Sequence, residues 1–199
     1  MMGDVLSALF ENGHPWPRSR ATFPQMVRED AYSENKQKEF RMSELQLAIK
    51  SPVGPLYLTA SEGGLTGVNF DKRKTPMAED GKAAQMKFLR QAEHELAAYF
   101  KGELTHFTVT LATGGTEFQN KVWAQLKKIP FGKTCSYRDI AERIGNPKAT
   151  RAVGTANGRN PFGIIVPCHR VIAADGTLGG YAGGVERKTK LLEIERAHR

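Results

Sequence analysis

The second half of the chain carries three helix-start signals in quick succession, and they constrain the fold more than any other feature. Thr116 with Gln119, and Ser136 with Asp139, have the three-residue spacing of a capping box, in which side chains and backbone N–H groups bond reciprocally. An Asn-Pro pair follows at residues 146–147, where proline suits the first position of a helix. The pattern predicts short helices separated by tight turns, the last two forming a helix-turn-helix.

The stretch before these helices alternates short apolar segments with Gly- and Pro-containing turns. Residues 45–50, 56–60 and 65–70 have the pattern of an antiparallel β-meander. Residues 83–101 place apolar side chains at helical spacing, and 107–111 are expected to form a further short strand. We therefore predict an α+β fold: a small N-terminal sheet-plus-helix domain, then a mainly helical, winged-helix-like domain with the helix-turn-helix.

Composition and cysteine usage place the chain among globular proteins. Residues 1–40 are polar without clear periodicity, so we expect a poorly ordered extension before an N-terminal domain at 41–111 and a C-terminal domain at 112–199. No apolar run approaches the ~18 residues of a membrane span. Cys135 and Cys168 are too few for a disulfide framework, which favours a reducing, cytoplasmic location. A soluble monomer without membrane contact is the expectation.

The net charge of +8 is concentrated at one end of the chain. The last 81 residues hold 15 basic and 6 acidic side chains, which favours a polyanionic partner, although a solvated lysine-rich surface would look the same. In this region a helix expected at 148–158 consists of small residues around a single Arg151. Gly154 inside it costs about 1 kcal/mol against alanine, so close backbone approach is expected, either to another helix or to a nucleic-acid groove.

A cysteine with basic neighbours follows an apolar run. Residues 163–166 are expected to form a strand, and Pro167, Cys168, His169 and Arg170 come directly after it. A cysteine in such a place is usually a small core residue, but adjacent cationic groups favour the nucleophilic thiolate. Neighbours on a strand point to opposite faces, so His169 can assist Cys168 only if the chain turns or a water bridges them.

The chain closes with a glycine-rich loop at 176–184 and a helix predicted at 185–198. On this helix Glu195 shares one face with two leucines and with Lys188. A carboxylate in that position either is partly buried against a partner such as an imidazole or pairs in solvent with Arg199 four residues later. Spacing alone leaves both readings open.

These segments together carry a specific resemblance. The segment IVPCHRVI at 165–172 resembles the active-site segment of the O6-alkylguanine-DNA alkyltransferases. The segments SYRDIA, GNPKATRAVGTANGRNP and GGYAGGVERKTKLLEIE follow the family's order and spacing, and ATGGTEFQNKVW at 112–123 extends the match. Residues 45–111 fit the family's variable N-terminal domain in outline, and residues 1–40 have no recognised counterpart.

The resemblance implies DNA repair by direct reversal, in which O6-alkylguanine, mainly O6-methylguanine, is flipped from duplex DNA. Its alkyl group would pass irreversibly to Cys168 in a single turnover, within a DNA-binding and alkyl-transfer domain. By the same resemblance His169 takes the thiol proton through a water, and Glu195 orients His169. Asn160 would brace the turn before the active-site segment, and Tyr137 would crowd the backbone phosphate, contact the base and protonate the leaving guanine.

The resemblance also assigns binding residues. Arg151 would fill the space that the flipped nucleotide vacates, with the small helix entering the minor groove. The other residues assigned to DNA are Ala152, Gly154, Thr155, Ala156, Asn157 and Arg170. The residues assigned to the substrate pocket are Val166, Pro167, Tyr181, Ala182, Gly183 and Lys188.

The implied reaction needs no metal or organic cofactor, and its partner is double-stranded DNA containing O6-alkylguanine. Structural zinc is not expected, because no histidine has metal-ligand spacing with a cysteine. Three alternatives remain. A thiol hydrolase would turn over repeatedly on an acyl substrate, a non-catalytic sensor of alkylated DNA would lack the acceptor cysteine, and a transcription factor would prefer one sequence and usually dimerise.

Overall fold

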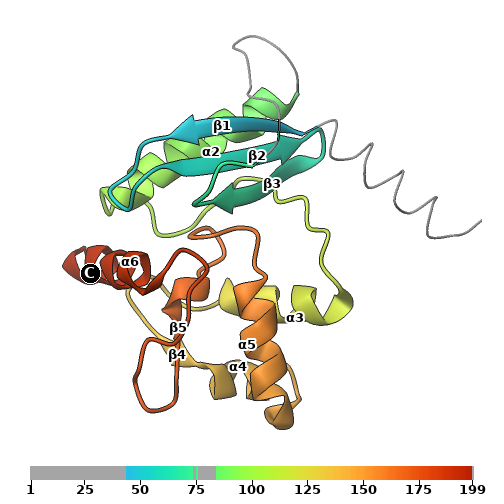
Figure 1. Cartoon of the computed structure of the whole chain (residues 1–199), viewed down its shortest axis with the longest axis vertical. Coiled ribbons are helices and arrows are strands. Elements are labelled where there is room, and N and C mark those ends of the chain that lie inside the picture. Colours follow the sequence, from blue (N-terminus) through green and yellow to red (C-terminus); the bar gives the residue numbers. More distant parts are fainter. Residues whose placement is uncertain (1–43, 74, 76–83, 199) are drawn as a thin grey trace, which may run out of the picture. The chain divides into compact units, whose positions relative to one another are not determined.

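A computed structural model describes residues 44–73, 75 and 84–198, which are coloured in Figure 1. The extension predicted at 1–40 lies outside the described residues. Within the described residues, no helix is long and apolar enough to cross a membrane.

The N-terminal half is a three-stranded antiparallel sheet with one helix against it. Strands β1 (Leu45–Ile49), β2 (Leu56–Ser61) and β3 (Gly64–Asn69) lie in the order β1-β2-β3, and α2 (Gln85–Phe100) packs on one face (Figure 1). Every residue of the central strand is buried except the half-buried Tyr57, so this strand is covered on both of its faces. The predicted meander and helix are confirmed.

The strand predicted at 107–111 is wrong. The backbone N–H groups of Thr108 and Val109 donate to the Glu95 carboxylate of α2, at 2.9 and 3.2 Å, instead of to a neighbouring strand. Only the last residue of the segment forms an isolated bridge, to Leu65 of β3. A side chain from a distant helix therefore satisfies the donors that the sequence pattern assigned to a sheet.

The C-terminal half is mainly helical, and its first helices begin where the capping signals predict. Both capping boxes are formed. The side-chain oxygens of Thr116 and Ser136 accept from the backbone N–H groups of Gln119 and Asp139, and the side chains of Gln119 and Asp139 accept from the backbone N–H groups of Thr116 and Ser136. The α-helices are α3 (Glu117–Leu126), α4 (Tyr137–Arg143), α5 (Thr150–Gly158) and α6 (Val185–Ala197).

The tight turn between α4 and α5 contains Gly145, whose φ of 75° is a conformation that glycine adopts readily. A single 3-10 turn, η1 (Pro147–Ala149), precedes α5, so the predicted helix at 148–158 begins as a 3-10 turn. Proline stands at its start as predicted, but Asn146 makes no side-chain capping bond among the described residues. Helices α4 and α5 form the predicted helix-turn-helix.

The strand predicted at 163–166 is also wrong. Phe162 makes one isolated bridge to Val68 of β3, after which the chain turns, and Ile164 has a positive φ of 72°. Cys168 lies in a second 3-10 turn, η2 (Cys168–Arg170). The short strand β5 (Val171–Ile172) then pairs in parallel with β4 (Cys135–Ser136), close to the start of α4.

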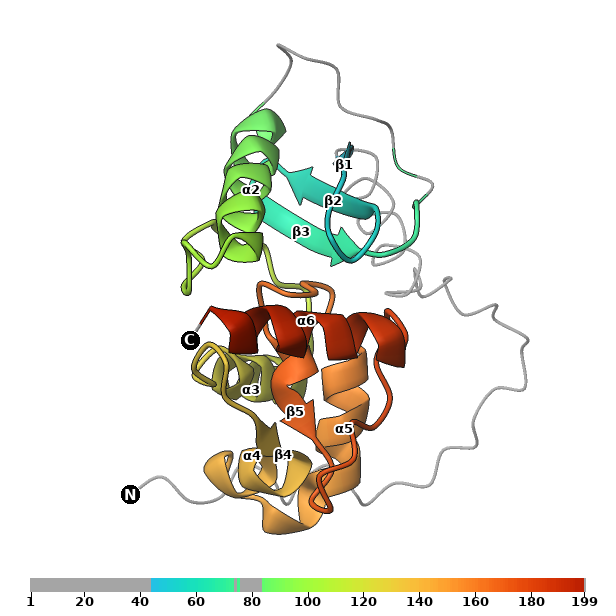
Figure 2. The same cartoon turned by 90° about the vertical axis from the view of Figure 1, so that its left-hand side faces the viewer.

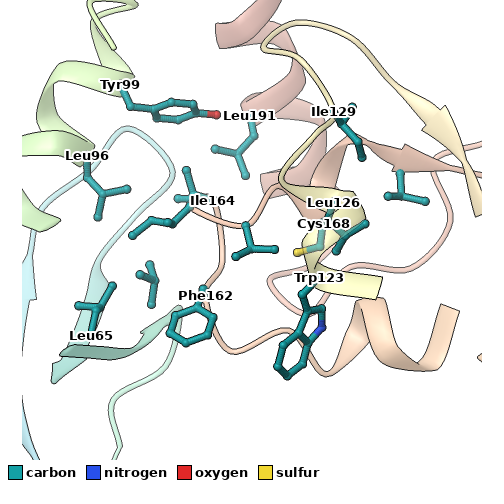
Figure 3. Close-up of a cluster of buried hydrophobic side chains, with 14 of the residues drawn as sticks. Leu65, Leu96, Tyr99, Trp123, Leu126, Ile129, Phe162, Ile164, Cys168 and Leu191 are labelled. Carbon is teal, nitrogen blue, oxygen red and sulfur yellow. The ribbon is translucent and has the colours of Figure 1, made fainter. Parts of the chain in front are cut away.

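One hydrophobic core joins the two halves. Leu65 and Leu96 from the N-terminal half belong to the same buried cluster as Trp123, Phe162 and Leu191 from the C-terminal half (Figure 3). Figure 2 shows α6 lying beside the N-terminal half, across the other C-terminal helices. Since burial of such side chains is the main favourable term in folding, this shared core holds α2 and α6 in fixed contact.

Candidate active site

Cys168 lines a cavity of about 540 Å³ and is itself buried, with 5% of the residue surface exposed. One side of the cavity is formed by the helix-turn-helix, including Tyr137 and Gly154. Tyr181 and Ala182 of the glycine-rich loop form another part, and Phe70, which follows β3, adds an aromatic ring from the N-terminal half. Burial raises the pKa of the Cys168 thiol, while a hydrogen bond from the Asn160 side chain lowers it. A thiol in this setting needs a base to become nucleophilic.

The 3-10 turn resolves how His169 and Cys168 can act together, because in η2 consecutive side chains are not forced to opposite faces of a strand. His169 is fully buried, and its Nε2 lies 2.7 Å from Glu195 Oε1. Its Nδ1 is buried and has no hydrogen-bond partner among the described residues. With Nε2–H donating to the carboxylate, Nδ1 carries the free lone pair that can accept a proton.

Glu195 of α6 is the centre of a buried polar network. Its carboxylate accepts from His169, from the Tyr99 hydroxyl at 2.7 Å, from the Gly132 backbone N–H at 2.9 Å and from Arg170 at 2.9–3.1 Å. Burial raises the pKa of this carboxyl, but hydrogen bonds and charge from His169 and Arg170 outweigh that effect and bring it to about 2. The solvent-exposed reading of Glu195 is therefore wrong, since its side chain has no exposed surface.

The assignment of Arg170 to DNA binding is wrong. The residue is 4% exposed; its Nε and Nη2 bond Glu195, and its Nη1 donates to the Ile129 carbonyl at 2.6 Å. A guanidinium engaged in this way is a planar clamp on a carboxylate and presents nothing to a groove. It holds Glu195 in place behind His169.

Asn160 braces the turn before the active-site segment, as predicted. Its amide donates to the Val166 carbonyl at 2.8 Å, and its carbonyl oxygen accepts from the Phe162 N–H at 3.0 Å. Together with its bond to the Cys168 thiol, these contacts tie the segment that follows α5 to Cys168.

The outer face of α5 carries most, not all, of the predicted DNA residues. Arg151, Ala152 and Thr155 are exposed and Gly154 is half-buried. The prediction of groove contact is wrong for two buried residues, which lie on the inner face of the helix, Ala156 and Asn157. The Ala156 carbonyl accepts from the Trp123 indole at 2.9 Å, and the Asn157 amide donates to the Cys168 carbonyl at 3.4 Å.

The predicted pocket residues divide in the same way. Tyr181 and Ala182 line the cavity, whereas the remaining four do not: Val166, Pro167, Gly183 and Lys188. Lys188 is fully buried on α6 and donates to the Val171 and Leu178 carbonyls, so it fastens the glycine-rich loop to β5. Burial lowers its pKa, and its charge in turn lowers the pKa of Cys168.

Two side chains that the sequence did not single out support the pocket wall. Arg187 stacks over Phe70 at 5.1 Å, and its Nη1 donates to the Gly183 carbonyl at 2.9 Å. The Phe70 ring also meets Tyr181 edge-on, with 5.6 Å between centroids. In the sequence, the one feature that could have indicated this role is that Arg187 is a basic residue directly before Lys188.

In the part of the chain that the structure describes, the other chemistry-bearing groups do not form a second centre. Cys135 is a buried free thiol in β4, and burial raises its pKa. Within residues 44–73, 75 and 84–198, no three His, Cys, Asp or Glu side chains come together as a metal site would require.

A buried thiol with a histidine–carboxylate pair behind it, beside a basic helix-turn-helix, defines a class of DNA-binding protein with a nucleophilic cysteine. Two models of known families match the chain. Residues 117–197 match the family described as "6-O-methylguanine DNA methyltransferase, DNA binding domain", and residues 45–113 match its "ribonuclease-like domain".

Similar proteins are named methylated-DNA–protein-cysteine methyltransferases. The chain is 54% identical over 148 residues to a methylated-DNA–protein-cysteine methyltransferase of Methanosarcina acetivorans, covering 74% of this chain and 95% of that one. It is 48% identical over 154 residues to the same enzyme of Mycobacterium tuberculosis, covering 75% and 90%. The crystal structure of Mycobacterium tuberculosis OGT in complex with DNA superposes with a TM-score of 0.70 at 46% identity, covering 77% of this chain and 94% of that one.

The chain belongs to the methylated-DNA–protein-cysteine methyltransferase family. The resemblance drawn from the active-site segment and the predicted α+β fold class are both confirmed.

Proposed function

We propose that this protein repairs O6-alkylguanine, mainly O6-methylguanine, in duplex DNA by moving the alkyl group to Cys168 once per molecule. The observation that carries the proposal is the thiol itself: it is buried at the cavity, with His169 and Glu195 directly behind it. Family membership supplies the substrate class, since the relatives are named for methylated DNA and a cysteine acceptor.

The proton leaves the thiol toward His169. Burial lowers the pKa of His169, so the ring is neutral at rest and its free Nδ1 can accept the proton, through a water as in the family's relay. Because the pKa of Glu195 is about 2, the carboxylate does not take the proton from the ring but stabilises the imidazolium. Lys188 adds a nearby positive charge that favours the Cys168 thiolate.

The substrate base must leave the duplex to reach Cys168, because the reacting carbon is inaccessible inside the stack. Extrusion costs a few kcal/mol, less for a mispaired lesion. The exposure of Arg151 on α5 supports a role in filling the vacated space, and Tyr137 lies where the helix-turn-helix meets the cavity. Exposed small residues on α5 allow its backbone to approach the minor groove.

The chemistry is an in-line displacement at the alkyl carbon. The Cys168 sulfur forms a new bond to that carbon as the bond from the carbon to guanine O6 breaks, and the leaving guanine takes a proton. Burial raises the pKa of Tyr137, which therefore remains a protonated donor at the cavity. The product is a thioether, which water does not cleave, so each molecule acts once and no metal or organic cofactor takes part.

Mass spectrometry tests the proposal directly. The intact protein is mixed with a duplex carrying one O6-methylguanine, then digested, and the peptide containing Cys168 is expected to gain one methyl group per molecule. Cys168→Ser abolishes the gain, while Cys135→Ser, which alters the other buried thiol, leaves it intact. Tight binding of the lesion without modification would indicate a damage sensor, and repeated turnover on an acyl ester would indicate a thiol hydrolase.

Two further expectations accompany the proposal. A one-to-one complex of monomeric protein with a short duplex is expected by light scattering, since the site is complete within one chain. The cytoplasmic location stays a prediction from cysteine usage.

A further inference from the structure

Tyr99 brings a hydroxyl from the N-terminal half into the buried network behind the nucleophile. The residue lies near the end of α2, is fully buried, and donates to Glu195 Oε1 at 2.7 Å. Its oxygen is also 3.5 Å from His169 Nε2. Figure 3 shows its ring reaching from α2 toward Leu191, which lies on α6 one turn before Glu195.

We propose that Tyr99 is a positioning residue for alkyl transfer, through which the N-terminal half sets the geometry and basicity of the His169–Glu195 pair. The inference rests on the proposed function, since it concerns the same proton path. Tyr99 touches neither the substrate nor Cys168; it acts through the carboxylate.

The hydrogen bond from Tyr99 makes Glu195 a weaker base. Oε1 accepts hydrogen bonds from three side chains, Tyr99, His169 and Arg170. Each donor stabilises the negative charge, and a carboxylate stabilised in this way attracts the proton on His169 less strongly. Tyr99 thus limits how far the Glu195 carboxylate raises the pKa of His169.

The other charged and titratable groups around the pair act from fixed positions. Arg170 contacts Glu195 from η2, Lys188 lies two turns earlier on α6, and Cys168 precedes His169. Burial raises the pKa of Tyr181, and Cys168 and Tyr99 raise it further. Burial raises the pKa of Tyr99 far above its usual value, and the Glu195 charge raises it further, so the hydroxyl remains a donor at every working pH.

Packing alone does not explain a tyrosine at this position. The ring contacts Phe100, Phe107 and Phe131 at centroid distances of 5.2 to 5.8 Å, an aromatic setting that phenylalanine would fill equally well. A buried hydroxyl is unfavourable unless it is bonded, and here its bonded partner is the carboxylate of the relay. The hydroxyl is therefore the part of Tyr99 that needs a functional reason.

The decisive variant is Tyr99→Phe, which removes the hydroxyl and keeps the ring. Single-turnover methyl transfer is measured by rapid quench from mildly acidic to mildly alkaline pH. We expect the acidic limb of the rate profile to move to higher pH by about half a unit to one unit, with transfer slowed up to about tenfold at the acidic end. Tyr57→Phe in β2, a half-buried tyrosine of the same sheet domain, is the matched control and should leave the profile unchanged.

A second variant separates positioning from packing. Leu96→Ala, one turn before Tyr99 on the same helix, opens the shared core but keeps the hydroxyl, so it should lower stability without moving the pH profile. If Leu96→Ala shifts the profile as Tyr99→Phe does, the effect is one of packing and the inference is overturned.

Nuclear magnetic resonance titration of the His169 ring tests the inference independently of any substrate. The pKa of His169 is expected to rise in Tyr99→Phe by about half a unit or more relative to the unaltered chain. An unchanged His169 pKa overturns the role of Tyr99, whatever the transfer assay gives. Failure of the unaltered chain to transfer methyl would instead overturn the proposed function.

Discussion

Replacing Glu195 with glutamine should remove a large and pH-dependent part of the stability of this protein. The substitution keeps the shape of the side chain but removes its charge and two of its acceptor positions. Arg170, which is 4% exposed, would then be a buried cation without its carboxylate partner. Removing one partner of a buried pair costs about 3–5 kcal/mol, so we expect a loss of this size near neutral pH.

The pH dependence follows from the pKa of Glu195. Its ordinary value of 4.5 falls to about 2 in the folded protein, a difference of 2.5 units, which corresponds to about 3 kcal/mol. Because the folded pKa is the lower one, this stability is present above 4.5 and is lost as the pH falls toward 2. Buried, neutral His169 acts in the same direction, since its pKa is also lowered and only the unfolded chain gains its proton below about 6.5.

Urea unfolding across a pH series measures both effects. The stability gap between the unaltered chain and Glu195→Gln should be largest near neutral pH and should narrow below about 4.5, by roughly 1.4 kcal/mol per pH unit. Glu193→Gln, an exposed carboxylate on the same helix, is the matched control and should change stability by less than about 0.5 kcal/mol. A gap for Glu195→Gln of under about 1 kcal/mol, constant with pH, would refute the reasoning.

Three further substitutions separate DNA contact, helix packing and the pocket wall. Arg151→Ala should weaken duplex binding and reduce the slope of log affinity against log salt by about 1, whereas Arg170→Met should leave that slope unchanged, both measured by fluorescence anisotropy. Gly154→Ala should raise the free energy of unfolding by about 0.5–1 kcal/mol, because the new methyl group meets only the Tyr137 ring, at 3.9 Å, yet weaken DNA binding in the same assay. Gly183→Ala should slow methyl transfer while leaving duplex affinity unchanged. The Cβ of the new alanine would lie 2.6 Å from the Phe70 ring and would displace that ring, which contacts Tyr181 in the pocket wall. Equal transfer rates for the variant and the unaltered chain in rapid-quench assays would contradict this.

Local signals predicted the elements whose stabilising groups are close in sequence. Both capping boxes and the Gly145 turn involve residues within a few positions of one another, so the sequence pattern contains all of their partners. The two strand predictions failed for different reasons. The backbone N–H groups of Thr108 and Val109 donate to the Glu95 side chain of a distant helix instead of to a strand. The apolar run at 163–166 fits a strand and a buried turn equally well, and the structure has a turn there, with a positive φ at Ile164.

The same contrast between local and distant contacts applies to the candidate site. The resemblance named Cys168, His169 and Glu195, but only the fold shows that Arg170 closes on Glu195 rather than on DNA. Exposure of a basic residue depends on which way the chain turns, and the 3-10 turn directs Arg170 inward. The prediction for Ala156 and Asn157 failed for another reason: α5 has small side chains on both of its faces, so their size does not distinguish the inner face from the outer one.

The contacts behind the nucleophile also explain why the N-terminal half belongs to the mechanism rather than only to the fold. Tyr99 and Glu195 are 96 positions apart, so no motif links them, yet their hydrogen bond is as short as the one between Glu195 and His169. On the other side of the cavity, Phe70 supports the loop that carries Tyr181. In the proposed mechanism the C-terminal half provides the nucleophile and the helix-turn-helix, while the basicity of His169 and the shape of the pocket depend on side chains that the sheet domain presents. A C-terminal half expressed alone would expose the core around Leu191 and would lose the Tyr99 donor, so weakened transfer by such a fragment would have two separable causes.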